Sequence, residues 1–214
     1  MEIPLRDRTD PALRVIETML WLPDSGPVRG DRHLARAQRT CEVLGFAYDP
    51  AEVHKRLFSI SSDTPQRVRL TFDLDGEVGM TRQPFTLGSS PEKAMVGISG
   101  VRLDPEEPFL RIKTTRRTLY DRTLKQKAAE LYDVLFFNTR GELCEGAFTN
   151  VFLQLDGQMV TPALSSGLLP GILREQLLVT GECREAVLDY HDLMAAEALW
   201  VGNSLRGLIP AAVA

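Results

Sequence analysis

The chain has 214 residues, of which 43% are hydrophobic and 25% charged, enough to bury a sizeable core as one large domain or two small ones. This composition excludes a disordered or fibrous protein. The net charge of −4, without a long basic run, excludes general nucleic-acid binding.

Cysteine usage and hydropathy limit the compartment and the metal chemistry. Cys41, Cys144 and Cys183 are odd in number, widely spaced and outside any CxxC or Cys/His ligand pattern, which argues against structural zinc and disulfides and favours a reducing compartment. The N-terminus is charged and broken by proline, and the chain lacks an apolar run long enough to cross a bilayer. We therefore expect a cytoplasmic protein with no membrane and no nucleic-acid partner.

The first expected elements are a strand and a helix. "RVIETMLW" (residues 14–21) is rich in β-branched and large apolar residues and ends at a "PDSGP" turn, which predicts a strand. In residues 31–45 apolar side chains recur at steps of three and four, which predicts a helix capped by Asp31 and closed by Gly45. This spacing puts Arg36 off the apolar stripe, close to His33 on the next face.

Later in the first half, "PAEVHKRLF" predicts a short helix and "AMVGISGVRL" a strand. Between them, residues 67–80 alternate polar and apolar side chains around Asp75-Gly76, a strong hairpin signal. Residues 104–109 are rich in proline and acid, which is typical of a connection. We place the boundary there, between a small α/β domain over residues 1–105 and a larger domain over residues 106–214.

The second half again mixes helices and strands. Helices are predicted for residues 116–132, 170–181 and 190–198, and strands for residues 133–138, 150–155, 158–162 and 199–202. A hairpin turning at Asp156-Gly157 favours an antiparallel or mixed sheet over a doubly wound parallel one, so the expected fold class is α+β.

The common catalytic signatures are absent from the sequence. It contains no GxGxxG, GxxxxGK[ST], GxSxG or HExxH, and His33, His54 and His191 are too scattered to suggest a metal site. Composition and periodicity alone predict no more than a cytoplasmic α+β enzyme.

Four separated segments carry a family resemblance. They are "HLAR" (residues 33–36), "KTTRRTLYD" (113–121), residues 138–174 from "NTRGELCEG" to "GLLPGILR", and "LWVGNSLRGLIP" (199–210). In this order and spacing the chain resembles the class IV pyridoxal-phosphate enzymes, which include branched-chain and D-amino-acid aminotransferases and 4-amino-4-deoxychorismate lyase. The resemblance implies the two-domain, D-amino-acid aminotransferase-like fold, pyridoxal 5'-phosphate as cofactor, a small-molecule amine as substrate, and a homodimer.

Within the family, "KTTRR" followed by a tyrosine, and "GNSLRGLIP", are most similar to the lyase, in particular to the type fused behind aminodeoxychorismate synthase. The implied reaction eliminates pyruvate from 4-amino-4-deoxychorismate and gives 4-aminobenzoate for folate synthesis. A class IV aminotransferase acting on branched-chain or D-amino acids is the alternative, because the same apparatus can transfer an amino group. A relative that keeps the fold without catalysis is a third reading.

The resemblance makes Lys113 the Schiff-base lysine, which also moves the substrate proton. The residue type suits this role, because pyridoxal phosphate needs an amine and a lysine near other cations loses its proton readily. Lys113 follows the apolar "PFL" and precedes Arg116 and Arg117. A solvated lysine is the plain alternative from composition.

Glu145 is the expected partner of the cofactor's ring nitrogen, which must stay protonated and therefore needs a carboxylate beside it. It follows Lys113 at the spacing that the resemblance implies. Glu142 competes for this role, but it falls in the "TRGE" turn, where we expect it to be solvated. Without the resemblance the two glutamates cannot be ranked.

For the cofactor phosphate, the resemblance implies a bidentate cation and backbone N–H groups at a helix start. The implied residues are Arg36, Ile172, Leu173, Ser204 and Leu205. For Ile172 and Leu173 a place in the helix core is compatible with this role, because amides and side chains act separately.

Four further residues take implied roles. Tyr120 would hydrogen-bond the cofactor's phenolic oxygen, with packing at a helix boundary as the alternative, and Arg117 would meet a substrate carboxylate. Asn150 would fix the loop that carries Glu145, and Thr18 would face the pocket.

The sequence also departs from the family pattern in two places. Relatives carry a further glycine-rich segment before the "ET" strand, so we expect a shortened N-terminal domain with a more open site or an altered dimer. Ala147 stands where threonine is common, which removes a hydroxyl near the ring.

Overall fold

The computed structural model describes residue 10 and residues 12–214, and these fall into two compact units. The first unit runs to Leu87 and takes in Lys113–Arg116, whereas the second contains Gly88–Ile112 and Arg117–Ala214. The predicted boundary between residues 105 and 106 differs from this division. The reason is strand β5 (Ala94–Leu103), which is hydrogen-bonded on both sides to strands of the second unit.

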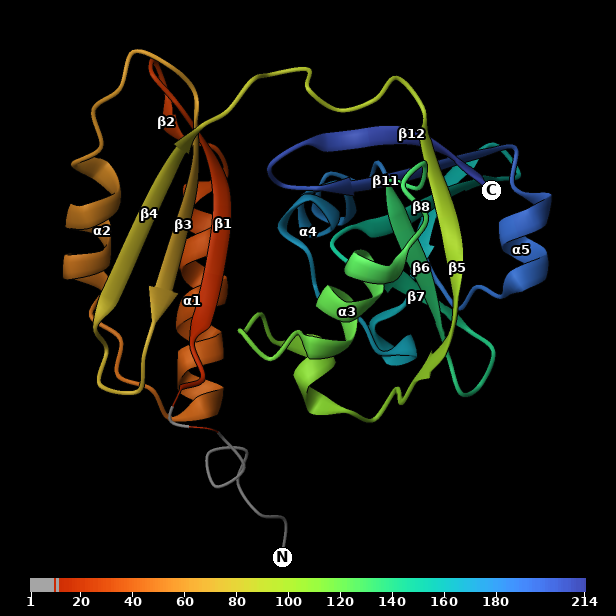
Figure 1. Cartoon of the computed structure of the whole chain (residues 1–214), viewed down its shortest axis with the longest axis horizontal. Coiled ribbons are helices and arrows are strands. Elements are labelled where there is room, and N and C mark those ends of the chain that lie inside the picture. The colour runs from red at the N-terminus through yellow and green to blue at the C-terminus, as the bar shows by residue number, and fades with distance from the viewer. Residues whose placement is uncertain (1–9, 11) are drawn as a thin grey trace, which may run out of the picture. The chain divides into compact units, whose positions relative to one another are not determined.

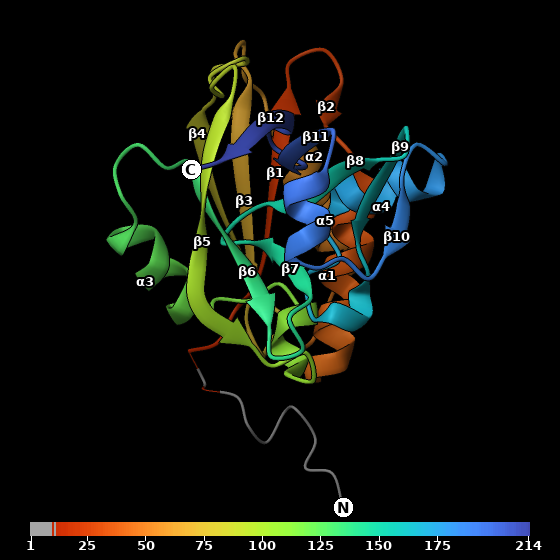
Figure 2. The same cartoon turned by 90° about the vertical axis from the view of Figure 1, so that its right-hand side faces the viewer.

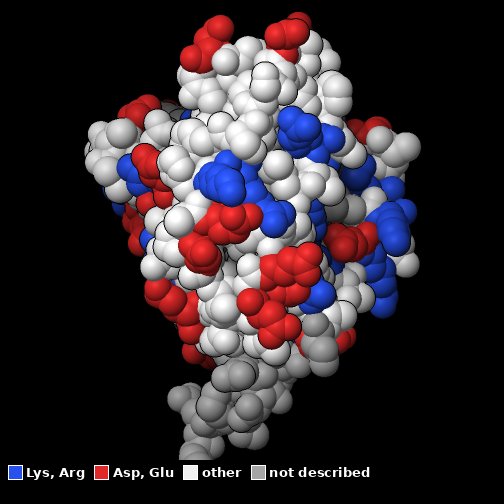
Figure 3. Space-filling model, turned by 90° about the vertical axis from the view of Figure 1, so that its left-hand side faces the viewer, with Lys and Arg blue, Asp and Glu red and all other residues white. Residues whose placement is uncertain are grey.

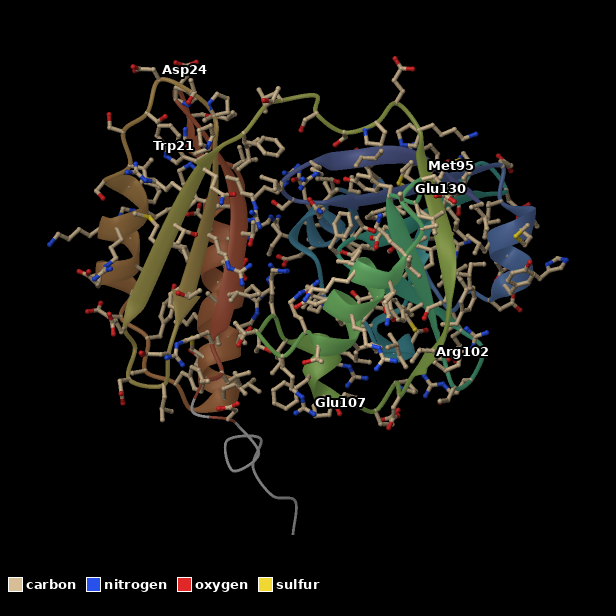
Figure 4. The ribbon with its side chains drawn as sticks, in the orientation of Figure 1. Trp21, Asp24, Met95, Arg102, Glu107 and Glu130 are labelled. Atoms are coloured by element: carbon tan, nitrogen blue, oxygen red, sulfur yellow. The ribbon has the colours of Figure 1, made fainter. Side chains whose placement is uncertain are left out.

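Within the described residues, the first unit is a four-stranded antiparallel sheet in the order β2-β1-β3-β4, accompanied by two helices (Figure 1). Its elements are β1 (Val15–Leu22), β2 (Gly26–Pro27), α1 (Gly30–Leu44), α2 (Pro50–Phe58), β3 (Gln66–Phe72) and β4 (Val78–Pro84). Strand β3 alternates between buried and half-buried positions, as a strand with one face in the core should. Trp21 lies near the end of β1, and Asp24 lies in the turn to β2 (Figure 4).

Helix α1 was predicted in its extent and its end, but two details were wrong. Gly45 closes it in the left-handed conformation, with φ 69°, and donates its N–H to the last carbonyls as expected. The residue before the helix is Arg29, which makes no side-chain cap, and Asp31 lies inside the first turn. Arg36 belongs to the buried face of α1 together with His33, whereas the spacing had placed it off that face.

Within the described residues, the second unit is an eight-stranded mixed sheet in the order β10-β9-β8-β11-β12-β5-β6-β7. Besides β5, its elements are η2 (Pro108–Arg111), α3 (Thr118–Gln126), β6 (Asp133–Asn138), β7 (Leu143–Gly146), β8 (Asn150–Leu155), β9 (Gln158–Pro162), η3 (Leu164–Ser166), α4 (Ile172–Val179), β10 (Arg184–Ala186), α5 (Tyr190–Ala195), β11 (Ala198–Asn203) and β12 (Gly207–Val213). Strand β5 is parallel to β6 and β12, and β10 is parallel to β9, so the predicted α+β class with a mixed sheet is confirmed.

Strand β6 is the apolar centre of this unit. All six of its positions are buried, which is typical of a strand covered on both faces. Figure 2 shows α3 on one side of β5 and β6, and α4 and α5 on the other. Strand β6 therefore provides a rigid support for the segments that follow it in the chain.

The surface and the thiols are those of an ordinary globular chain. On the face drawn in Figure 3, acidic and basic side chains are interspersed, as expected for 25 basic and 29 acidic residues. Cys41, Cys144 and Cys183 are buried free thiols. In the part of the chain that the structure describes, the helices are too short or too polar to span a membrane.

Candidate active site

In the first unit, two side chains of α1 meet a glutamate of β1. Arg36 donates Nε–H to Glu17 Oε1 at 2.8 Å and an Nη2–H to Oε2 at 2.7 Å, and the His33 ring bonds the same Oε2 through Nδ1 at 2.6 Å. His33 and Arg36 are three residues apart on a helix, so they share one face. Glu17 is fully buried, and the other two are at most 6% exposed.

This cluster is held by charge. Burial opposes the charged form of Glu17, but the Arg36 guanidinium and the hydrogen bonds from His33 and Arg36 outweigh it and lower the pKa of Glu17 to about 2. Burial lowers the pKa of His33 in spite of the Glu17 carboxylate, so the ring is neutral at pH 7 and carries its proton on Nδ1. Glu17 thereby fixes the plane of the guanidinium while using two of its five N–H donors.

Sequence reasoning gave Arg36 a role but missed Glu17 and His33. The available signal was a single carboxylate inside the otherwise apolar "VIETMLW", because a charge in a buried strand needs a partner. Thr18 is half-buried and, because neighbours alternate along a strand, lies on the face of β1 opposite Glu17. The structure thus separates Thr18 from the Glu17, His33 and Arg36 cluster.

Lys113 lies on a segment that pairs with the start of β1. Its carbonyl accepts the Ile16 N–H at 2.9 Å, and the next residue, Thr114, forms an antiparallel bridge with Val15. The side chain is half-buried, and its charge helps to lower the pKa of His33, after burial and Arg36. The backbone around Lys113 is therefore fixed to the strand that carries Glu17.

In the second unit, Glu145 lies at a β-bulge. Phe136 pairs with Glu145 and Phe137 with Leu143, so Cys144 is an extra residue in β7. Bulges change the direction in which neighbouring side chains point, and they are frequent beside active sites. The Glu145 carboxylate is 6% exposed and accepts the Tyr120 O–H at 2.6 Å and the Leu169 N–H at 3.1 Å.

Tyr120 and Arg117 both support this glutamate. Burial, and then the Glu145 charge, raise the pKa of Tyr120 well above its usual range, so the hydroxyl stays protonated and donates to Glu145. The Arg117 guanidinium lies 5.3 Å from the centre of the Tyr120 ring and donates to the Ala147 carbonyl at 2.7 Å. The structure therefore places both side chains on the Glu145 loop, whereas the resemblance had implied cofactor and substrate contacts.

The competing glutamate, Glu142, is engaged in its own turn. It accepts hydrogen bonds from Arg140 and Asn138. The Arg140 hydrogen bonds outweigh a small desolvation effect and lower the pKa of Glu142 to about 2. Glu142 serves the β6–β7 turn rather than standing exposed to solvent.

Asn150 connects the Glu145 region to helix α4. Its Nδ2 donates to the carbonyl of Leu169 at 3.0 Å, and the N–H of Leu169 is the one that binds Glu145. A Cβ on Gly171 would lie 1.8 Å from Asn150 Oδ1, so only glycine permits this close passage. Asn150 was expected to fix the Glu145 loop, and it does so indirectly, through the segment before α4.

Helix α4 begins without a side-chain cap. Gly171 is the residue before it, and the first amides of the helix, those of Ile172 and Leu173, have no acceptor within the helix. Such a start attracts anions, because the N–H groups and the helix dipole point the same way. The described residues contain no group of three or more His, Cys, Asp or Glu placed to hold a metal ion.

The turn between β11 and β12 packs against this helix start. A Cβ on Gly202 would lie 3.1 Å from Leu173 Cδ2, which places α4 close to the turn. Ser204 is 7% exposed. The Leu205 N–H, expected to bind phosphate, donates to Asn203 Oδ1 at 3.1 Å, so it already has a partner within the turn.

Comparison with known proteins gives a family and three informative relatives. A family model described as "Amino-transferase class IV" matches residues 14–213. A provisionally assigned branched-chain-amino-acid aminotransferase of Thermotoga maritima is 30% identical over 200 residues, which cover 86% of this chain and 71% of the relative. A provisionally assigned aminodeoxychorismate lyase of Schizosaccharomyces pombe is 29% identical over 184 residues, which cover 81% of this chain and 79% of the relative.

A solved structure adds fold evidence. The crystal structure of a provisionally assigned amino-acid aminotransferase of Mesorhizobium loti has a TM-score of 0.88 with this chain at 42% identity, covering 94% of this chain and 100% of that one. The names of the three relatives divide between amino-group transfer and elimination.

Replacing Glu17 should destabilise the protein. Glu17→Gln removes the carboxylate that the buried Arg36 binds, and we expect a loss of about 3 kcal/mol at pH 7, measured by urea unfolding. The folded pKa of Glu17 lies below its ordinary value of 4.5, so its stabilisation is complete above pH 4.5 and is lost as the pH falls towards 2. The variant should lack this part of the pH dependence. Equal unfolding midpoints for variant and wild type would contradict the account, and Glu52→Gln, in an exposed pair with Arg56, is the matched control.

Gly146 should not tolerate a methyl group. A Cβ there would lie 2.3 Å from Asp133 Oδ2 and 2.5 Å from Thr149 Oγ1, so Gly146→Ala should cost roughly 1–3 kcal/mol in the free energy of unfolding. Gly100→Ala is the control, because nothing lies within 4 Å of a Cβ at that position. Equal losses for the two variants would show that the crowding at Gly146 is not real.

Proposed function

Because the chain belongs to the class IV aminotransferase family, whose enzymes use pyridoxal 5'-phosphate, we propose that it is a 4-amino-4-deoxychorismate lyase. The observation that carries the choice of lyase is the combination of "KTTRR" and its tyrosine with "GNSLRGLIP" in one chain. The Schizosaccharomyces pombe relative supports the same choice. The reaction would take place in the cytoplasm, in a homodimer, and would supply 4-aminobenzoate for folate synthesis.

The chemistry of the described residues fits the cofactor. Glu145 is a buried carboxylate whose donors Tyr120 and Leu169 are neutral groups, so its charge suits a protonated ring nitrogen. The uncapped start of α4 and the oriented guanidinium of Arg36 suit a phosphate. The proposed cofactor-binding residues are Arg36, Lys113, Tyr120, Glu145, Ile172, Leu173, Ser204 and Leu205, with Tyr120 acting through Glu145.

When bound, the cofactor supplies an aldehyde that an amine can bond and a ring that withdraws electrons from the carbon next to the substrate nitrogen. Lys113 would hold the cofactor through Nζ. Once the substrate amine has taken its place, Lys113 Nζ would remove the proton from the amine-bearing carbon. Pairing of the Lys113 backbone with β1 limits the positions that this amine can reach.

Glu145 would keep the ring nitrogen protonated, which maintains the electron withdrawal. The electron pair left by the proton forms a new double bond of the substrate ring, and the bond to the enolpyruvyl oxygen breaks. The leaving group takes up a proton and becomes pyruvate. The two products together contain all the atoms of the substrate, so the reaction requires no keto acid. Arg117 and Thr18 are the proposed substrate contacts.

An aminotransferase is the second candidate. The Mesorhizobium loti and Thermotoga maritima proteins, with 42% and 30% identity, both carry aminotransferase names. The same lysine and glutamate would serve that reaction, because only the carbon that is reprotonated differs. The two functions therefore share one site and are distinguished by their products.

Lys113→Ala should abolish turnover. The variant lacks the amine that holds the cofactor and moves the proton, so we expect a loss of more than about a hundredfold in kcat. Lys125→Ala, on the exposed side of α3, is the matched control and should keep wild-type turnover. An active Lys113→Ala variant would rule out this lysine for either reaction.

The products separate the two candidate functions. We expect the purified protein, loaded with pyridoxal phosphate, to convert 4-amino-4-deoxychorismate into equal amounts of pyruvate and 4-aminobenzoate without any keto acid. Branched-chain and D-amino acids, each with 2-oxoglutarate, form the parallel assay. Amino-group transfer in that assay, with no 4-aminobenzoate in the first, would replace the lyase by the aminotransferase.

A further inference from the structure

Asp133, the first residue of β6, is a fully buried carboxylate with four hydrogen-bond donors. Oδ1 accepts the N–H groups of Val134 at 2.7 Å and Ala147 at 2.9 Å. Oδ2 accepts the Thr149 O–H at 2.6 Å and the Phe148 N–H at 3.4 Å. Burial raises the pKa of Asp133 to about 6, against the four hydrogen bonds that lower it.

Three of these donors come from one loop, residues 146–149, which directly follows Glu145. The loop is also closed on itself, because the Gly146 N–H donates to the Thr149 carbonyl at 2.8 Å. The carboxylate of Asp133 occupies the space that a side chain at Gly146 would need. Asp133 therefore determines the path of the chain immediately after Glu145.

The same hydrogen bonds determine where the loop carbonyls point. In a trans peptide the N–H and C=O groups point in opposite directions. Since the Phe148 N–H points to Asp133, the Ala147 carbonyl of that peptide points away from it, and it accepts the Arg117 guanidinium at 2.7 Å. The Phe148 carbonyl accepts Asn203 Nδ2 at 3.3 Å.

Through this loop, Asp133 is linked to three parts of the candidate site. Glu145 precedes the loop, and Arg117 covers the Tyr120 ring that donates to Glu145. Asn203 holds the turn that contains Ser204 and Leu205. None of these links requires Asp133 to approach a bound ligand.

We propose that Asp133 is a positioning residue of the cofactor site, which acts through residues 146–149 on Glu145. This inference rests on the proposed use of pyridoxal phosphate. A carboxylate is needed rather than an amide, because all four partners are donors and only a carboxylate offers acceptor atoms alone. Asp133→Asn places an NH₂ group against the Thr149 hydroxyl or the backbone amides.

The test is a double-mutant cycle read as the affinity of the whole apo chain for pyridoxal phosphate, followed by the absorption of the bound cofactor. Asp133→Asn should weaken binding on the order of tenfold, the lower end of what partners of ligating residues contribute at metal sites. In a Glu145→Gln background the same change should cost less than about twofold, because the residue through which it acts is gone. Asp189→Asn, at the capping box of α5, is the matched substitution and should leave the affinity unchanged.

The outcomes separate this inference from the proposed function. A wild-type chain that binds no pyridoxal phosphate would refute both. Wild-type binding with an unchanged affinity in Asp133→Asn, or with an equal loss in the two backgrounds, would refute the positioning role alone. If Asp133→Asn does not fold, Thr149→Val removes one donor at nearly constant volume and should weaken binding by a smaller factor that again disappears in the Glu145→Gln background.

Discussion

Burying a carboxylate is costly unless donors replace the water it loses, and this requirement organises both units of the protein. Glu17, Asp133 and Glu145 are all buried, and each meets the requirement differently. Glu17 binds the guanidinium of Arg36 and has its pKa lowered to about 2. Asp133 binds only neutral N–H and O–H groups among its hydrogen-bond donors, and its pKa is raised to about 6.

These two acids are structural, and they leave other groups in defined positions. Glu17 holds a cation in a fixed orientation in the first unit, and Asp133 holds the loop behind Glu145 in the second. Glu145 itself is held by Tyr120 and by Leu169, whose carbonyl Asn150 binds. In the account given above, the chemistry belongs to Lys113 and Glu145, and the remaining polar side chains restrict their movement. Such preorganisation is where catalytic sites obtain much of their effect.

Much of the fold could be predicted, because it is written in local patterns. The strand at "RVIETMLW", the end of α1 at Gly45 and the hairpins at Asp75-Gly76 and Asp156-Gly157 follow from periodicity and turn chemistry. The division of the chain could not be predicted, because β5 joins the second unit by pairing with strands distant in sequence. The same holds for Lys113, whose segment returns to β1 of the first unit.

The candidate site was predictable in its residue types but not in its contacts. The resemblance pointed to Arg36, Lys113 and Glu145, yet nothing local shows that Tyr120 donates to Glu145 or that Leu205 donates to Asn203. Asp133 was read only as the start of a strand, since its four donors include three that lie 14 to 16 positions away. Long-range hydrogen bonds of this kind leave no periodic signal in the sequence.

The central claim is that Lys113 is the residue to which pyridoxal phosphate attaches in this chain. The most direct measurement is mass spectrometry of peptides from the cofactor-loaded protein after borohydride reduction. The account predicts one reduced cofactor group on the peptide that contains Lys113. A modification spread over the exposed lysines, or confined to a lysine other than Lys113, would contradict it.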